Sequence, residues 1–202
     1  MKCIHTIIHI RRPIRTAFAV LAIAAVPAGA VAVPAVAAAN ATTTSKAAAG
    51  CPTGWGSLPE ASTFRGPGYL TNVRTGRHAC FDRIVFDVDG KPSWFLVHYV
   101  NEVSTVGEGR PVPLRGGAKL EINLSVPSYD GTDLHRTYSP ANDDELTDVS
   151  GYRTFRQVAT AGSFEGETTI GLGVRARLPF RVFTLTGPGD TGRIVVDVAH
   201  SW

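Results

Sequence analysis

Apolar and polar side chains alternate along several short segments of the chain, a pattern that predicts β-strands with one buried face. The clearest segment is 119–126, where four apolar side chains alternate with four polar ones. Residues 81–88 show the same alternation, and an Asp89-Gly90 turn signal separates them from a second strand at 94–100. Further segments rich in strand-forming residues are 153–159, 168–174, 179–186 and 193–200.

No segment beyond residue 41 shows a sustained helical period. The sequence therefore predicts an all-β protein, built as a single β-sandwich domain of about seven to nine strands. A polar stretch at 127–150 predicts a long loop, which in a compact domain often carries function. Inside this stretch, the acidic run at 143–145 would suit the first turn of a short helix over residues 142–146.

One hexapeptide occurs twice with a single change. Arg83–Val88 reads RIVFDV and Arg193–Val198 reads RIVVDV, so five of six positions are identical at a separation of 110 residues. In each copy the arginine and the aspartate lie on the polar face of the strand, where they can pair with neighbours across a sheet. We expect two equivalent strands in a sandwich of related halves. Chance similarity between two good strand sequences stays an alternative.

The first 41 residues have the form of a secretory signal peptide. Four basic residues precede an apolar run, and a small-x-small cleavage motif follows at 39–41. Pro27, Gly29 and Pro34 interrupt the apolar run, so no stable membrane span is expected after signal removal. Residues 42–50 carry no core-forming pattern and are predicted to be a flexible leader, which leaves 51–202 as the folded domain.

Removal of the signal also changes the net charge. The chain has 20 Lys and Arg against 17 Asp and Glu, and residues 1–41 hold four of the basic residues and none of the acidic ones, so 16 − 17 leaves −1. Nucleic acid binding needs concentrated positive charge, so the composition argues against nucleic acid as a partner.

Two cysteines remain after signal removal, Cys51 and Cys80. Two thiols in an exported protein most simply form a disulfide. This bond would pin an irregular, Gly- and Pro-rich strap at 51–77 to the domain. Residues 48–50 before Cys51 also resemble a lipoprotein cleavage motif, although a polar segment separates them from the apolar run. Lipidation of Cys51 therefore stays an alternative.

Sequence motifs of catalysis are absent. The chain has no Gly-x-Ser-x-Gly elbow, no phosphate-binding Gly-x-x-x-x-Gly-Lys-Ser/Thr loop and no His-Glu-x-x-His metal motif. The histidines beyond the signal are too dispersed to predict a metal site, and no cofactor is expected. We therefore expect a binding protein rather than an enzyme, with no catalytic residues and no metal.

Aromatic faces and arginine forks are the natural contacts for a glycan or a glycan-peptide ligand. The richest combination of these side chains lies around the long polar stretch and comprises Tyr152, Arg153, Arg156, Tyr129 and Tyr138. We predict that these five residues contact ligand. The alternative is a structural role, in which Tyr152 packs into the fold and the arginines pair with nearby carboxylates.

Several strand motifs, taken in order, resemble a known family. They are CPTGWG at 51–56, GYRTF at 151–155, FRQV at 155–158, TIGL at 169–172, FRVFTL at 180–185 and the repeated hexapeptide. Together they look like an AMIN domain, and more closely they are similar to the AMIN-like proteins of actinobacteria over residues 51–202.

The resemblance implies a β-sandwich at the cell envelope. AMIN domains are binding modules without catalytic residues that target periplasmic amidases and secretin components to peptidoglycan. By this resemblance the protein is secreted, associates with the cell wall and binds peptidoglycan or another wall glycan. Two alternatives remain: a module that binds another envelope protein and, less favoured, a glycan hydrolase that uses two of the dispersed carboxylates.

Overall fold

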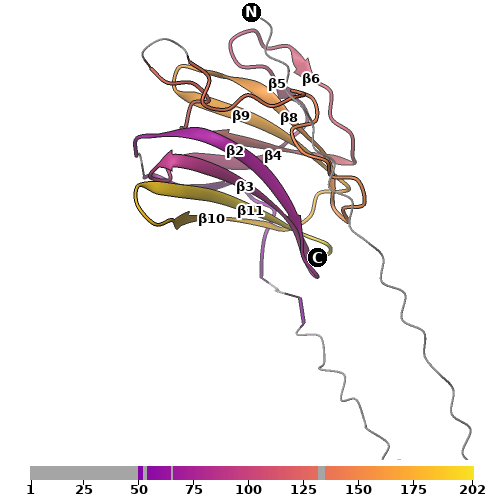
Figure 1. The fold of residues 1–202 in the computed structure, drawn as a ribbon. Helices are drawn as coiled ribbons and strands as arrows, with labels where there is room; N and C mark the ends of the chain where they lie inside the picture. Colours follow the sequence, from indigo (N-terminus) through magenta and orange to yellow (C-terminus); the bar gives the residue numbers. More distant parts are fainter. Residues whose placement is uncertain (1–49, 52–53, 65, 132–134) are drawn as a thin grey trace, which may run out of the picture. The chain divides into compact units, whose positions relative to one another are not determined.

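Two antiparallel β-sheets face each other across one hydrophobic core, as Figure 1 shows for this computed structural model. The structure describes residues 50–51, 54–64, 66–131 and 135–202, so the predicted signal peptide at 1–41 and nearly all of the predicted leader at 42–50 lie outside the described residues. The predicted all-β sandwich is confirmed, because the described residues form eleven strands and no helix. Within this part of the chain, no helix is long and apolar enough to cross a membrane.

The larger sheet has five strands, in the order β1 (Glu60–Ala61), β4 (Phe95–Val100), β7 (Ala118–Leu124), β9 (Glu167–Val174) and β8 (Phe155–Phe164). The second sheet has four strands, in the order β10 (Phe180–Thr186), β11 (Thr191–Ala199), β3 (Phe81–Gly90) and β2 (Gly68–Arg77). A short hairpin of β5 (Val103–Ser104) and β6 (Pro111–Val112) forms a third sheet. Each predicted strand corresponds to one of β3, β4 and β7 to β11.

The period-two pattern places the core between the two sheets. In β7, Leu120, Ile122 and Leu124 are fully buried, and in β3 the inward side chains of Ile84 and Phe86 meet them from the opposite sheet. Burial of a Val, Leu, Ile or Phe side chain contributes about 1.5–3 kcal/mol. The alternation read from the sequence is therefore also the main source of stability.

Strand β2 corrects one prediction. Residues 68–77 were expected to be part of an irregular strap, and they form ten residues of regular strand at the edge of the four-stranded sheet. A register shift between Leu70 and Asn72 breaks the period of two. Leu70 and Val73, the buried apolar side chains of this strand, are therefore three positions apart and show no alternation.

Residues 142–146 correct a second prediction, because they form a turn rather than a short helix. The side-chain oxygen of Asn142 accepts the backbone N–H of Asp144 at 2.9 Å. This local bond offers the backbone an alternative to helical hydrogen bonding.

The repeated hexapeptide forms the two middle strands of the four-stranded sheet. β3 and β11 pair directly and antiparallel, so Arg83 lies opposite Asp197 and Asp87 lies opposite Arg193. The two copies are therefore neighbours in one sheet rather than equivalent strands in two halves of the sandwich. The expected pairing across the sheet is present at one end, where Arg83 donates to both oxygens of Asp197 at 2.6 and 2.9 Å.

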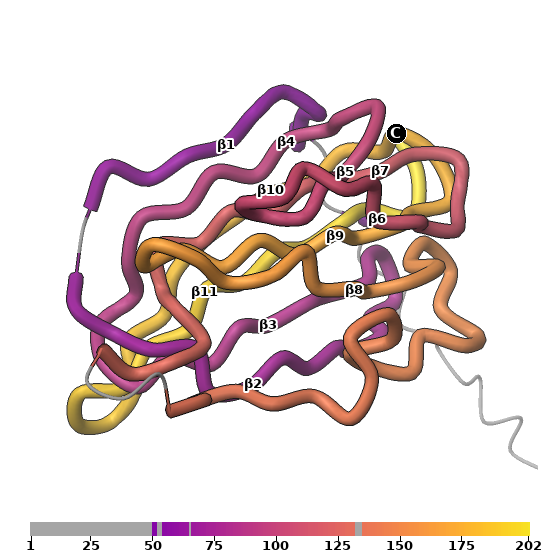
Figure 2. The backbone as a smooth tube through the Cα atoms, turned by 90° about the horizontal axis from the view of Figure 1, so that it is seen from above, coloured from indigo at the N-terminus to yellow at the C-terminus, as the bar shows by residue number. Residues whose placement is uncertain are grey.

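Two irregular segments cover the sides of the sandwich, where the edge strands of the two sheets face each other. On one side, the N–H of Phe180 donates to the carbonyl of Gly56 at 2.8 Å, and Glu60–Ala61 pairs with β4 of the other sheet. On the other side, the polar stretch forms backbone hydrogen bonds with both sheets. The N–H of Leu70 in β2 donates to the carbonyl of Pro127, and the N–H of Leu146 donates to the carbonyl of Val158 in β8. Figure 2 shows this stretch running beside β2 and then β8.

The β5–β6 hairpin packs on the outer face of the five-stranded sheet (Figures 1 and 2). Small residues of β8 and β9 make room for it. A Cβ at Gly171 would lie 2.7 Å from the Leu114 side chain, and a Cβ at Gly173 would overlap the carbonyl of Arg115. The glycines of β9 therefore alternate with core residues because a second layer covers this face.

We expect Gly173→Ala to lower the free energy of unfolding by about 1–3 kcal/mol, because the added methyl group displaces backbone. Urea unfolding measures the change. Gly76→Ala in β2 is the matched control, because the nearest atom to its Cβ would be 3.8 Å away. Equal stability of the two variants would show that the hairpin layer tolerates displacement.

Cys51 and Cys80 form the predicted disulfide, with their Cα atoms 5.3 Å apart and 29 positions apart in sequence. Cys80 directly precedes β3, so the bond ties the start of the strap to the middle of the four-stranded sheet. The disulfide thus restricts the segment of the strap that leads to β1.

Replacement of both cysteines by serine should lower the free energy of unfolding by about 3–4 kcal/mol, the loop-closure value for a loop of this length. Chemical unfolding of the wild type with and without reductant gives an independent measure. A double variant as stable as the oxidised wild type would contradict this role.

Candidate ligand-binding site

The five residues predicted to contact ligand lie in two different places. Tyr129 and Tyr138 line a hollow of about 700 Å³, whereas Tyr152 and Arg156 line a smaller one of about 410 Å³. Arg153 is exposed and lines neither of these hollows. The structure therefore brings the two loop tyrosines together and separates them from the other three residues.

The larger hollow lies between the polar stretch and the turn that joins β8 to β9, and we call it the β8–β9 hollow. The polar stretch supplies the two tyrosines, Arg136 and Asp143. The β8–β9 hairpin supplies Phe164 and Glu165. This wall combines three aromatic side chains with one cation and two carboxylates. Aromatic faces and paired polar groups of this kind suit a sugar ring that carries amide or carboxylate substituents.

Both tyrosines of the hollow are held by the surrounding structure. The Tyr129 hydroxyl accepts the backbone N–H of Gly166 at 3.1 Å, and Tyr138 packs against the main core. Burial raises the pKa of the Tyr138 phenol, and the charge of Asp143 raises it further. Tyr138 therefore keeps its proton at neutral pH and can donate a hydrogen bond to a ligand oxygen.

Arg136 and Phe164 are the wall residues that the sequence did not single out. Arg136 is exposed, and its side chain forms no hydrogen bond or ion pair with the described residues. Phe164 is 54% exposed at the end of β8. The sequence signal for Phe164 was an aromatic residue between two predicted strands. Its place in the hollow could not be predicted, because the facing polar stretch precedes β8 and meets Phe164 only in the folded protein.

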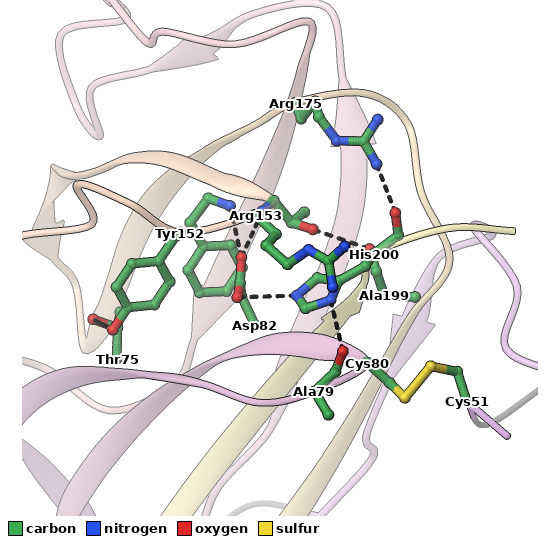
Figure 3. A network of polar contacts seen from close by, with 12 residues as sticks. Cys51, Thr75, Ala79, Cys80, Asp82, Tyr152, Arg153, Arg175, Ala199 and His200 are labelled. Carbon is green, nitrogen blue, oxygen red and sulfur yellow. Dashed lines mark hydrogen bonds and ion pairs between the residues drawn. A yellow bond between two sulfur atoms is a disulfide. The ribbon is translucent and has the colours of Figure 1, made fainter. Parts of the chain in front are cut away.

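The contacts of Tyr152 favour the structural alternative. Its hydroxyl lies 3.0 Å from the Thr75 hydroxyl, and its ring stacks on Phe155 with centroids 5.8 Å apart, as Figure 3 shows. The guanidinium of Arg77 lies 5.9 Å from the centre of the same ring. Tyr152 thus connects β2 to the start of β8.

The contacts of Arg156 are also those of a structural residue. Its Nη1 donates to the carbonyls of Tyr152 and Phe155 at 3.1 and 2.8 Å, and its Nη2 to that of Arg153 at 3.3 Å. These bonds satisfy carbonyls of the turn before β8. Arg153 itself forms no side-chain hydrogen bond with the described residues, so of the three it remains the one available to a ligand.

A buried carboxylate organises the end of the sandwich where β3 and β8 begin (Figure 3). The β8–β9 hollow lies where β8 ends. Asp82 is fully buried and accepts the backbone N–H groups of Thr154 and Phe155 at 2.6 and 3.2 Å. Its other oxygen lies 3.1 Å from His200 Nε2, and His200 Nδ1 lies 3.2 Å from the carbonyl of Ala79. Each ring nitrogen faces an oxygen atom, so the pair holds β3, β8 and the segment after β11 together.

We expect Asp82→Ala to lower the free energy of unfolding by about 3–5 kcal/mol, because it leaves two buried N–H groups and a histidine without their acceptor. Asp89→Ala, on the exposed face of the same strand, should change it by less than about 0.5 kcal/mol. Thermal unfolding of both variants checks the difference. Comparable melting temperatures would refute the structural role of Asp82.

Metal ligands do not gather in the described residues: no group of three or more His, Cys, Asp or Glu side chains is placed to hold an ion. The β8–β9 hollow therefore offers hydrogen bonds, ring faces and charges for non-covalent binding. Its two carboxylates, Asp143 and Glu165, are exposed.

Comparison with known proteins gives one match. The family model of the AMIN-like domain matches residues 68–200, from the first residue of β2 to the residue after β11. The match thus covers the polar stretch and every strand of the two sheets except β1, and it leaves out the part of the strap before β2. No curated protein and no solved structure matches the chain.

Proposed function

This chain belongs to the AMIN-like domain family, and we propose that it is an exported, non-catalytic module that binds peptidoglycan in the cell envelope. Family membership supports the assignment to a peptidoglycan-associated binding module. The β8–β9 hollow is the observation that carries the proposal to a surface of this protein.

The chemistry of the hollow supports a glycan-peptide ligand. Tyr129, Tyr138 and Phe164 offer ring faces to a sugar, and Arg136 offers a free guanidinium to a carboxylate. Because the two tyrosines are held in place before binding, little side-chain entropy is lost when ligand binds.

Export is supported by two independent features. The N-terminal 41 residues have the form of a signal peptide, and the Cys51–Cys80 disulfide is a bond that persists in oxidising compartments outside the cytoplasm. Both features support a location of the folded domain in the compartment where peptidoglycan is present.

The rival to this proposal is binding of another envelope protein. The exposed aromatic and charged side chains of the hollow would serve a protein partner too. The two functions differ in what purified cell wall retains, because sacculi contain glycan and peptide but no partner protein.

Sedimentation with purified sacculi tests the proposal. The wild-type protein should co-sediment, and Arg136→Gln should weaken binding by about fivefold to tenfold, since a charge-assisted hydrogen bond is lost. Arg110→Gln is the matched control, because Arg110 is equally exposed and its partner is Glu108 in the β5–β6 hairpin. Arg153→Gln tests the second location: a loss of binding in that variant alone would move the site away from the hollow.

Two outcomes reject the proposal. Retention no greater than that of a secreted protein of equal size rejects glycan binding, and a stoichiometric crosslinked protein partner in cells would then favour the rival function. Release of soluble sugar fragments from the sacculi would instead identify a carboxylate-based hydrolase.

A further inference from the structure

The outer face of the four-stranded sheet carries a further concavity, which is smaller than the two hollows described above. It shares no lining residue with the β8–β9 hollow. Its volume is about 250 Å³, and its floor is formed by Val85 and Val195, which lie directly opposite each other on β3 and β11. We call it the valine-floored groove. No residue that the family comparison or the sequence analysis assigns to ligand binding lines it.

Three arginines surround this floor. Arg83 and Arg193 lie two positions before Val85 and Val195 on the same strand faces, and Arg74 of β2 lies opposite Val85. Arg83 and Arg193 lie at opposite ends of the valine pair, because Arg83 is opposite Asp197 and Arg193 is opposite Asp87. The Arg74 guanidinium bonds to Asp87, so it lies at the Arg193 end of the groove. The residues that line the groove include no carboxylate.

Aspartates outside the groove hold two of these arginines in fixed orientations. Arg74 uses Nε and Nη2 for Asp87, at 2.8 and 2.9 Å, and Arg83 uses Nε and Nη2 for Asp197, at 2.6 and 2.9 Å. The Nη1 group of each forms no hydrogen bond with a described residue. Arg74 therefore keeps an oriented donor for an incoming anion, whereas the Arg83 guanidinium packs on the rings of Phe81 and Phe183.

Arg193 is the third cation and has no ion-pair partner among the described residues. Asp87 lies opposite it in the sheet, but the oxygens of Asp87 already accept from Arg74 and Asn72. Asp87 pairs with Arg74 and Asp197 is shared by Arg83 and Arg181, so these aspartates leave Arg193 without an ion pair among the described residues. An anion would complete the set of pairs.

The groove is open and partly apolar, which restricts the anion. A Cβ at Gly76 would meet nothing nearer than the His78 ring at 3.8 Å, and Leu185 on the opposite side is 39% exposed. Val85 and Val195 are nearly buried, so the exposed Leu185 side chain supplies the main contact for a small apolar group beside the charge. A carboxylate next to a methyl group fits both parts of the groove, whereas a phosphodiester between polyol units offers no apolar part.

We propose that the valine-floored groove binds the terminal carboxylate of a short peptide whose last side chain is small and apolar. The D-alanine end of a peptidoglycan stem peptide has this chemistry, and this choice of source rests on the proposed function. The two sites would then read different parts of one ligand: the hollow the glycan, and the groove the peptide end.

Calorimetric titration with acetyl-D-alanyl-D-alanine tests the carboxylate directly, with the terminal amide of the same dipeptide as a neutral control. The acid should bind and the amide should bind at least about tenfold more weakly, since the amide lacks the charge that pairs with Arg193 and Arg74. Arg193→Gln should weaken binding of the acid by about tenfold, and Arg110→Gln should leave it unchanged. Unaltered circular dichroism of both variants shows that the fold is retained.

Equal binding of acid and amide, absence of binding, or an unaffected Arg193→Gln variant would each overturn the inference. Inorganic phosphate that competes as strongly as the dipeptide would also overturn it, because the groove would then be a general anion site. Sacculus sedimentation separates this result from the proposed function. If sacculi retain the wild-type protein and the Arg193→Gln variant equally, peptide binding in the groove is rejected and the proposed function stands. Dipeptide binding without sacculus retention rejects the proposed function alone.

Discussion

The open sides of a two-sheet sandwich are the constraint on which the rest of this structure depends. Each sheet buries one face, but the gap between their edge strands would leave core side chains and backbone groups in contact with water. Here two irregular segments cover these gaps. The strap brings β1 and its disulfide to one side, and the polar stretch brings the wall of the β8–β9 hollow to the other.

The division between predictable and unpredictable parts follows from this arrangement. Strands such as β7 were predictable because a strand with one buried face has apolar side chains at alternate positions. The disulfide was predictable because the two remaining cysteines allow one intramolecular bond. Strand β2 was not, because its register shift removes the alternation and its burial is supplied by the neighbouring polar stretch. The turn at 142–146 was missed because a single Asn side chain redirects the local hydrogen bonding.

The grouping of the candidate site residues could not be predicted from sequence. Nearness in sequence grouped Tyr152 and Arg156 with the loop tyrosines, and folding separated them. The reverse holds for Arg74 and Arg193, which are 119 positions apart in the chain and both lie beside Asp87 through strand register. Register is a property of the paired sheet, so a single sequence shows the repeated hexapeptide but not that its two copies pair with each other.

Glu60 illustrates what the strap does for the surface of a secreted protein. Its carboxylate accepts the outward N–H of Val182 at 2.8 Å, and the pKa of this carboxyl is raised chiefly by burial, an effect that the Val182 bond and the charge of Arg181 oppose. An edge strand with free N–H groups is a template for another chain, and an acidic side chain placed across it blocks that template. Proteolytic removal of the chain up to and including Glu60 would thus expose β10 as an edge strand that a second copy can pair with. An intact strap therefore protects the protein from edge-to-edge self-association.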